Sequence, residues 1–376
     1  MAANFYLSSH ANYHLHPRSA LVSARQEDLK HATEQELGWI EIWSGSVIQK
    51  LCKRLGLRQQ VIATAIVFFR RFYLRNSYCE TDCALVAAAC CYVAAKAEET
   101  PVHVKSAVAE ARVVFNDMGL SSFPTDNTKL AEMEFYLIEE LDFHLVIFHP
   151  YRSLVQLCGR DGGPTAGGEV GKATRSAMLE MDDTALQMAW FVINDTFRSS
   201  LCLIHPPHLI AIAAIYLAFS LHPPPSANIT APPPATTGSG PSSRTRRQSI
   251  DSGVPSSSTP AAPPARTGPP PPGGQTDPIT FLSTLNVDYT LVLEIVQEVI
   301  SLYELWNALE SSAAGTAAGA SASSGGGKAR AGTAKTTTVG ADEKVVGILQ
   351  RMRVERQKEQ QSEKERGKGT PSWKKG

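Results

Sequence analysis

The sequence predicts an all-α protein built from two tandem five-helix domains, and three observations support this prediction. Apolar residues recur at helical spacing in most segments of residues 34–222. The turns between these segments are short, as they are in compact helical bundles. An alanine-rich helix in the first half also has a counterpart in the second half, which indicates an internal duplication.

The first domain is expected within residues 34–145, after an N-terminal segment of residues 1–33. Gly56 is expected to end the first helix, because glycine readily adopts the left-handed conformation found just past a helix C-terminus. Asp82 is suited to cap the third helix, and Pro101 is suited to open the fourth. The predicted helices of this half are 34–55, 58–76, 82–98, a segment that starts at Pro101, and 126–142.

The second domain is expected within residues 146–309, with an insertion at 223–277. The insertion contains mainly Pro, Ser, Thr, Gly and Ala. It therefore lacks the apolar side chains that would offset the entropy of ordering, and we predict a disordered loop. Residues 310–376 are predicted to form a disordered basic tail, with some helical character in the charged stretch 342–366. The predicted helices of this half are 151–158, 180–199, 207–222, 278–285 and 287–309.

The duplication rests on the helices at 82–98 and 207–222, which share identical residues in register. Their small residues lie on several faces, which lets neighbouring helices approach closely from all sides. Each of these two helices is therefore expected to be the buried axis of its domain. The matching pairs are Leu85 and Leu209, Ala87 and Ala211, Ala89 and Ala213, Tyr92 and Tyr216, and Ala94 and Ala218.

Charge and cysteine usage restrict the class of protein. The formal net charge is zero, but the predicted folded part is acidic and the tail is basic, which argues against a folded nucleic-acid-binding surface. The seven cysteines form no CxxC motif and no Cys/His cluster with zinc spacing, so we expect reduced thiols in an intracellular protein. Neither a signal peptide nor an apolar run long enough to cross a membrane is recognisable.

Lys96 and Glu134 are charged residues that lie among apolar residues of their predicted helices. Lys96 ends an apolar helix in the string AAKAEE, whereas the aligned position of the second copy is Ser220. A basic residue near a helix C-terminus is favourable to the helix dipole without any further role. Glu134 has apolar neighbours at i±3 and i±4, and a carboxylate there is unfavourable unless it is paired. The two residues are thus either a polar spot for a partner or a structural ion pair.

AAKAEE, followed by EMEFYLIEELDF, resembles the first helical repeat of the cyclin family. In that family the Lys of this motif and the Glu of the fifth helix bind a kinase beside the mobile regulatory helix of its small lobe. The resemblance implies two cyclin-box domains, with Lys96, Glu134 and Glu99 at a kinase-binding surface. It also implies a non-catalytic regulator that needs no cofactor, because the kinase itself holds the ATP-orienting Lys and its Glu partner.

Longer strings resemble the cyclin C branch of this family in its fungal form. This resemblance implies that the partners are a cyclin-dependent kinase of the Mediator kinase module and the other subunits of that module. It further implies a nuclear protein that activates and represses RNA polymerase II transcription, with no direct contact with nucleic acid or membrane. The strings are NFYLSSH at 4–10, LRQQVIATAIVFFRRFY at 57–73, FHPYR at 148–152 and VINDTFRSSLCLIHPP at 192–207.

Three further residues take expected roles from the same resemblance. Tyr6, in the N-terminal segment, is expected to pack on the kinase side, unless the terminus is frayed. Asn194 and Asp195 fall in a string that resembles the surface between the two repeats of the family. Asn and Asp in a helix also cap or bond locally, so the local role stays open for both.

Two alternative classes were considered for this sequence. Another transcriptional cyclin would share the fold, but NFYLSSH argues against it. A TFIIB-like promoter-binding factor uses the same duplicated helical fold to hold DNA. It would be expected to carry an N-terminal zinc ribbon and basic repeat faces, and neither is recognisable in this sequence.

The remaining candidates for chemistry are few. His205 and His208 are spaced as a possible ligand pair, but no third ligand lies near them in the sequence, and we expect no metal site. Nucleotide-binding and hydrolase motifs are not recognisable, so the chain is not expected to be an enzyme. RTRRQSID, in the insertion, resembles a substrate of basophilic kinases with Ser249 as a possible phosphosite.

Overall fold

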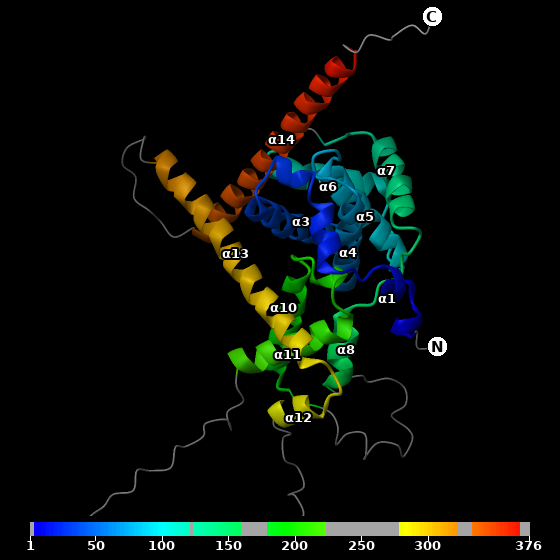
Figure 1. The fold of residues 1–376 in the computed structure, drawn as a ribbon, viewed down its shortest axis with the longest axis vertical. Coiled ribbons are helices and arrows are strands. Elements are labelled where there is room, and N and C mark those ends of the chain that lie inside the picture. The colour runs from blue at the N-terminus through cyan, green and yellow to red at the C-terminus, as the bar shows by residue number, and fades with distance from the viewer. Residues whose placement is uncertain are drawn as a thin grey trace, which may run out of the picture.

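The computed structural model describes residues 4–120, 123–158, 179, 181–222, 278–321 and 333–368, and within these residues helices are the only regular secondary structure (Figure 1). The helices form two bundles, each arranged around one central helix, so the predicted all-α class is confirmed. The insertion at 223–277 lies outside the described residues.

The N-terminal segment is docked onto the first bundle. The carboxylate of Asp28, which is fully buried, pairs with Arg25 at 2.9 Å and accepts a hydrogen bond from the backbone N–H of Tyr78 at 2.9 Å. His10 Nδ1 accepts a hydrogen bond from the backbone N–H of Phe148 at 3.1 Å. The elements of this segment are η1 (Phe5–Leu7), α1 (Ser9–Tyr13), α2 (Arg18–Ala24) and η2 (Asp28–Lys30).

The first bundle is built around α5. This helix packs against the other four helices of its bundle, and most of its residues are buried, as the alanine pattern predicts. Asp82 caps it by accepting hydrogen bonds from the N–H groups of Ala84 and Leu85. Gly56 has a φ of +69° just after α3, as expected of a glycine that ends a helix. The helices are α3 (Glu34–Arg54), α4 (Gln59–Arg75), α5 (Cys83–Ala97), α6 (Val104–Asp117) and α7 (Asn127–Glu140).

The second bundle is built around α11, which is buried along almost its whole length and packs against α8, α10 and α13. It therefore has the same central position as α5 in the first bundle. The elements are α8 (Pro150–Leu157), α10 (Asp183–Thr196), η3 (Leu201–Leu203), α11 (Pro207–Leu221), α12 (Pro278–Thr284) and α13 (Tyr289–Ser321).

The two bundles are joined by buried polar contacts and by close packing. Arg70 of α4 is 3% exposed, and its guanidinium donates hydrogen bonds to the carbonyls of Glu41 in the first bundle and Phe197 in the second. Gly38 of α3 permits a close approach of α13, because a Cβ at this position would lie 2.5 Å from the side chain of Leu305.

The C-terminal part differs from the expected disordered tail. The helix α13 continues beyond residue 309 to Ser321, and α14 (Thr333–Lys368) packs against α3 and α13 (Figure 1). Five of the eleven residues at 311–321 are alanine but two are glycine, so helix propensity alone does not explain the longer α13, which also packs against α14. The apolar residues of α14 recur at helical spacing and are buried, so this helix has the amphipathic face that a solvated tail lacks. They are Val345, Val346, Ile348, Leu349 and Met352.

Charged side chains hold the edges of α14 in place. Arg351 pairs with Glu36 at 2.9 Å, and Arg356 pairs with Glu80 at 2.9 Å. Lys344 places its ammonium 4.3 Å from the ring centroid of Trp39. The basic charge of the tail is thus matched in part by acidic residues of the first bundle.

Candidate functional site

Lys96 and Glu134 come together at the end of the central helix α5. Lys96 Nζ donates a hydrogen bond to Glu134 Oε1 on α7 at 2.6 Å, and the ammonium lies 4.2 Å from the ring centroid of Tyr92. The side chain of Lys96 is 41% exposed and that of Glu134 is 15% exposed. The pair is therefore an ion pair within the bundle that still presents its charges to the surface.

The surroundings of Lys96 favour its charged form. Burial opposes the charged form of Lys96, but the hydrogen bond and the charge of Glu134 outweigh it and raise the pKa of Lys96. The ammonium retains further N–H groups beyond the one that Glu134 accepts. An approaching backbone carbonyl can therefore bind Lys96 without breaking the existing pair.

The two glutamates that follow Lys96 have different environments. Glu98 accepts hydrogen bonds from Gln60 Nε2 at 2.7 Å and from Thr64 Oγ1 at 2.6 Å, so it fixes the end of α5 on α4. Glu99 is exposed and has a φ of +54°, a conformation that is unfavourable for a residue other than glycine. The sequence therefore places an exposed carboxylate where glycine would be the less strained choice.

Replacing Glu99 with glycine is expected to stabilise the fold. Relief of the left-handed strain exceeds the extra entropy of glycine in the unfolded chain, so Glu99→Gly should raise the free energy of unfolding by about 0.5 kcal/mol. The matched control is Ala97→Gly, at the last residue of α5, which should lower it by about 0.5 kcal/mol. Urea denaturation followed by circular dichroism measures both changes, and equal losses in the two variants would contradict the assignment of strain.

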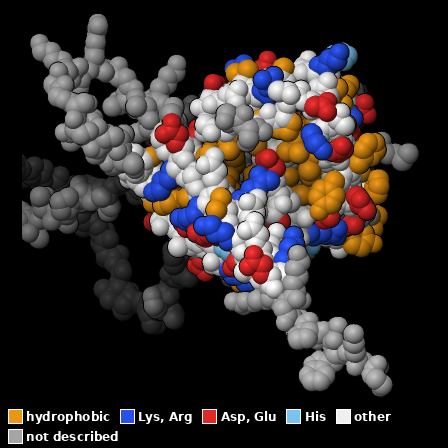
Figure 2. Space-filling view, turned by 90° about the horizontal axis from the view of Figure 1, so that it is seen from above, with side chains coloured by type: hydrophobic (Ala, Val, Ile, Leu, Met, Phe, Trp, Pro, Cys, Tyr) orange, Lys and Arg blue, Asp and Glu red, His pale blue; other side chains and the backbone are white. Residues whose placement is uncertain are grey.

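Aromatic side chains are exposed on α7 and just after it, and one of them, Phe135, follows Glu134 directly in the chain. Phe135 is 75% exposed, and Phe143 is 73% exposed and has a φ of +60°. Figure 2 shows hydrophobic side chains gathered on the side of the molecule where α7 lies, with charged side chains among them. Exposed aromatic groups around a partly desolvated charge are typical of a protein interface. We call the exposed side chains of Lys96, Glu99, Phe135 and Phe143 the α7 face.

No sequence pattern identifies Phe135 and Phe143 as surface residues. On a helix an aromatic residue is usually part of the core, and the apolar spacing of EMEFYLIEELDF gives no sign that Phe135 points outward. This segment does contain more apolar residues than one buried stripe of a helix requires, which indicates that some of them are exposed.

Tyr6 lies in the docked N-terminal segment and is 66% exposed. Its backbone N–H donates a hydrogen bond to Asn4 Oδ1, and the neighbouring Phe5 ring packs edge-on against Phe148 at a centroid distance of 5.5 Å. The ring of Tyr6 lies 6.1 Å from that of His208. The segment is therefore anchored by Phe5, and Tyr6 is presented to the surface.

Asn194 and Asp195 lie where α10 meets other parts of the chain. Asn194 Oδ1 accepts a hydrogen bond from the Tyr151 hydroxyl at 2.7 Å. Asp195 accepts hydrogen bonds from Arg198 at 2.8 Å and from the Tyr303 hydroxyl of α13 at 3.1 Å. Burial raises the pKa of Asp195, although Arg198 and Tyr303 act in the opposite direction. Both side chains thus have partners within the chain: Arg198 is a local partner of Asp195, whereas Tyr151 and Tyr303 come from other helices.

Arg198 extends this group into the first bundle. Its Nη2 donates a hydrogen bond to Gln49 Oε1 of α3 at 3.0 Å, and its guanidinium lies 4.4 Å from the ring centroid of Trp306. Asp195 therefore orients a residue that joins the two bundles.

The other candidates from the sequence are placed as follows. Ser249 lies outside the described residues. His205 and His208 do not face one another as a ligand pair, because His208 lies beside Phe5 and Tyr6. His205 instead lies near two glutamates of α13. All seven cysteines are buried. Among the helices that the structure describes, none combines the length and the apolar composition needed to cross a bilayer.

Comparison with known proteins identifies relatives across most of the chain. Residues 6–146 match the family described as the cyclin N-terminal domain. The chain is 36% identical over 360 residues to the RNA polymerase II holoenzyme cyclin-like subunit of Mycosarcoma maydis, covering 81% of this chain and 90% of that protein. It is 37% identical over 223 residues to cyclin-C of Rattus norvegicus, covering 58% of this chain and 72% of that protein.

One solved structure also aligns with most of this chain. A chain of the yeast TFIIK (Kin28/Ccl1/Tfb3) complex aligns with 79% of this chain and 99% of its own length, at 18% identity and a TM-score of 0.46. The family assignment rests instead on the sequence matches, which extend over most of the chain at more than one third identity. The chain belongs to the cyclin family as a homologue of cyclin C, and like other cyclins it is a non-catalytic regulatory subunit of a protein kinase.

Proposed function

We propose that this cyclin binds and activates a cyclin-dependent kinase of the Mediator kinase module in the nucleus, and so activates or represses RNA polymerase II transcription. Support for the transcriptional role comes from the relative in Mycosarcoma maydis, an RNA polymerase II holoenzyme cyclin-like subunit that aligns over 90% of its length. Support for the binding surface comes from the α7 face, where Lys96 is 41% exposed, its partner Glu134 is 15% exposed, and the next residue in the chain, Phe135, is 75% exposed. This pair is the observation that carries the proposal.

The proposed mechanism is a shift in the population of kinase conformations. A kinase is active when its regulatory helix lies inward, so that the Glu of this helix pairs with the ATP-orienting Lys. Lys96 and Glu134 offer a hydrogen-bond donor and an acceptor to backbone groups beside that helix, and Glu99 and Tyr6 extend the contact. Because such a surface binds the inward conformation more tightly than the outward one, binding alone increases the active fraction.

A double substitution tests the binding surface. Lys96→Ala with Glu134→Ala should weaken kinase binding by about 30-fold, because removal of desolvated charged partners at an interface typically costs about 2 kcal/mol. The fold should be retained, since Lys96 is more than one third exposed and a pair of this kind contributes only about 0–1 kcal/mol. The measurement is retrieval of the kinase from nuclear extract, read by mass spectrometry after circular dichroism shows that each variant is folded.

A matched control lies in the N-terminal segment. Lys30 and Glu27 form an ion pair of 2.8 Å whose side chains are 52% and 53% exposed. Lys30→Ala with Glu27→Ala removes the same chemical groups outside the α7 face, and kinase retrieval should be unchanged. The surface proposal fails if both double variants retrieve the kinase equally. The functional proposal fails if the unaltered chain retrieves no kinase with Mediator subunits.

A further inference from the structure

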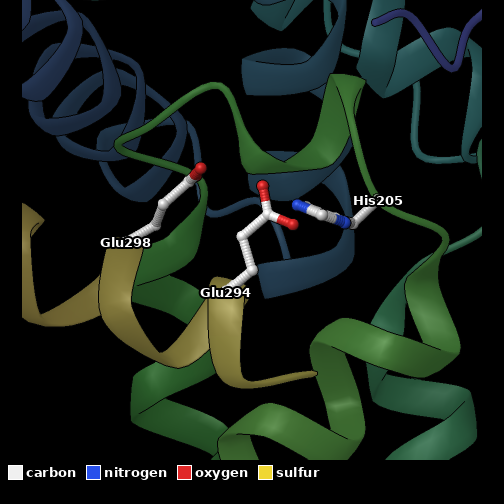
Figure 3. A group of neighbouring side chains, drawn as sticks. All are labelled: His205, Glu294 and Glu298. Carbon is white, nitrogen blue, oxygen red and sulfur yellow. The ribbon is translucent and has the colours of Figure 1, made fainter. Parts of the chain in front are cut away.

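A group of three side chains lies at the junction of the N-terminal segment with the second bundle. His205 comes from the loop between η3 and α11, and Glu294 and Glu298 lie one turn apart on α13 (Figure 3). One ligand atom from each side chain lies within 4.8 Å of the other two. Imidazole and two carboxylates are a donor set that suits zinc and related divalent transition metals.

His205 is a buried histidine with an unsatisfied ring nitrogen. The residue is 4% exposed, and its Nε2 atom has no hydrogen-bond partner among the residues that the structure describes. Figure 3 shows the ring directed toward the carboxylate of Glu294. A buried imidazole with an unpaired nitrogen that faces two carboxylates is an incomplete hydrogen-bonding arrangement.

Arg18 already supplies a positive charge to this group. Its Nε and Nη2 atoms donate hydrogen bonds to Glu294 Oε1 at 2.8 and 2.5 Å, and the guanidinium also pairs with Glu298. The side chain of Arg18 is 48% exposed. It can therefore turn into solvent without leaving a buried unpaired charge, and the two carboxylates are then available to another cation.

We propose that His205, Glu294 and Glu298 bind a divalent transition metal of the zinc class, in competition with the guanidinium of Arg18. Ligand atoms about 2.1 Å from one zinc ion lie closer together than 4.8 Å, so small side-chain rotations complete the site. The fourth position is open to water. The bound metal would join the loop before α11 to α13, which strengthens the second bundle and leaves the α7 face untouched.

Isothermal titration of the full chain with ZnCl2 tests the proposal, and Co²⁺ spectra report the ligand type. The unaltered chain should bind one zinc ion, with a Co²⁺ spectrum free of thiolate bands. Glu294→Gln with Glu298→Gln, and separately His205→Gln, should weaken this binding at least about 10-fold. His208→Ala is the matched control and should leave it unchanged. In each variant, circular dichroism verifies folding.

Arg18→Ala gives an outcome that a purely structural group would not produce. Removal of the competing guanidinium should tighten zinc binding by about 10-fold and enlarge the rise in thermal midpoint that zinc causes. If the unaltered chain binds no zinc, or if the Glu294 and Glu298 double variant binds it equally well, the proposal is overturned. Equal binding by the Arg18→Ala variant and the unaltered chain would also overturn it, because the two cations would then not share a site.

Discussion

Reversal of one charge, Lys96→Glu, is expected to lower the affinity for the kinase by about 100-fold or more. The new carboxylate would lie beside Glu134, and neither group would then donate a hydrogen bond to the partner's backbone. Unfavourable charges at a desolvated interface cost several kcal/mol, which corresponds to a change of this size. Surface plasmon resonance with the purified kinase measures the dissociation constant directly.

The swapped pair separates a binding role from a structural one. Lys96→Glu combined with Glu134→Lys restores an ion pair between α5 and α7, so the free energy of unfolding should return close to that of the unaltered chain. Kinase binding should stay weak, because donor and acceptor have exchanged places relative to the partner. Recovery of full affinity in the swapped variant would mean that the pair acts only within the bundle, as the alternative reading of the sequence holds.

Acidification below pH 6.5 is expected to destabilise the fold steeply. Burial, reinforced by the positive charge of Arg71, lowers the pKa of His10, His14 and His149 from 6.5 to about 3 in each case. These residues join the N-terminal segment and the segment before α8 to the first bundle. His14 Nε2 lies 3.0 Å from His144 Nδ1, and His149 Nε2 lies 2.7 Å from Thr64 Oγ1.

The sign of the effect follows from proton binding. Between pH 6.5 and pH 3 the unfolded chain binds protons at these three residues and the folded chain does not. Stability is therefore full above pH 6.5 and falls with decreasing pH by about 1.4 kcal/mol per unit for each residue, or about 4 kcal/mol for all three. Total stabilities of about 5–15 kcal/mol leave little margin for such a slope.

Urea denaturation at pH 7.5, about pH 6.5 and about pH 5.5 measures this slope. His149→Gln should reduce it by about one third, because one of the three titrating groups is removed. His103→Gln, at an exposed position before α6, is the matched control and should leave the slope unchanged. An unchanged slope in His149→Gln would show that the acid sensitivity has another origin.

Local sequence patterns were sufficient for most of the fold and for the centre of the proposed site. Glu134 stood out because its helical neighbours are apolar, and its pairing with Lys96 satisfies the need that this burial creates. The alanine-rich pattern predicted that α5 and α11 are central, because small residues on several faces have few other uses in a helix. The domain boundaries at 34–145 and 146–309 stay predictions.

Features that depend on distant parts of the chain were not predictable. His205 and Glu294 are separated by a long stretch of sequence, and no local pattern indicates that α13 passes beside the loop before α11. Residues 342–366 are highly charged, and the few apolar residues that begin at Val345 did not indicate a buried face. The packing of α14 against the first bundle was therefore not predicted. Asn194 and Asp195 were considered as a surface, but their hydrogen bonds to Tyr151 and Tyr303 depend on helices outside their own segment.

The helix α13 spans both bundles, because it packs against α11 at one part of its length and against α3 at another. A helix of 33 residues is about 50 Å long and resists bending. The two bundles therefore cannot hinge against one another without breaking the contact at Gly38 and Leu305. Under the proposed mechanism, a cyclin braced in this way would meet the kinase as a rigid body. Little of the binding free energy would then be lost in ordering the cyclin, and more of it would remain to shift the kinase toward its active conformation.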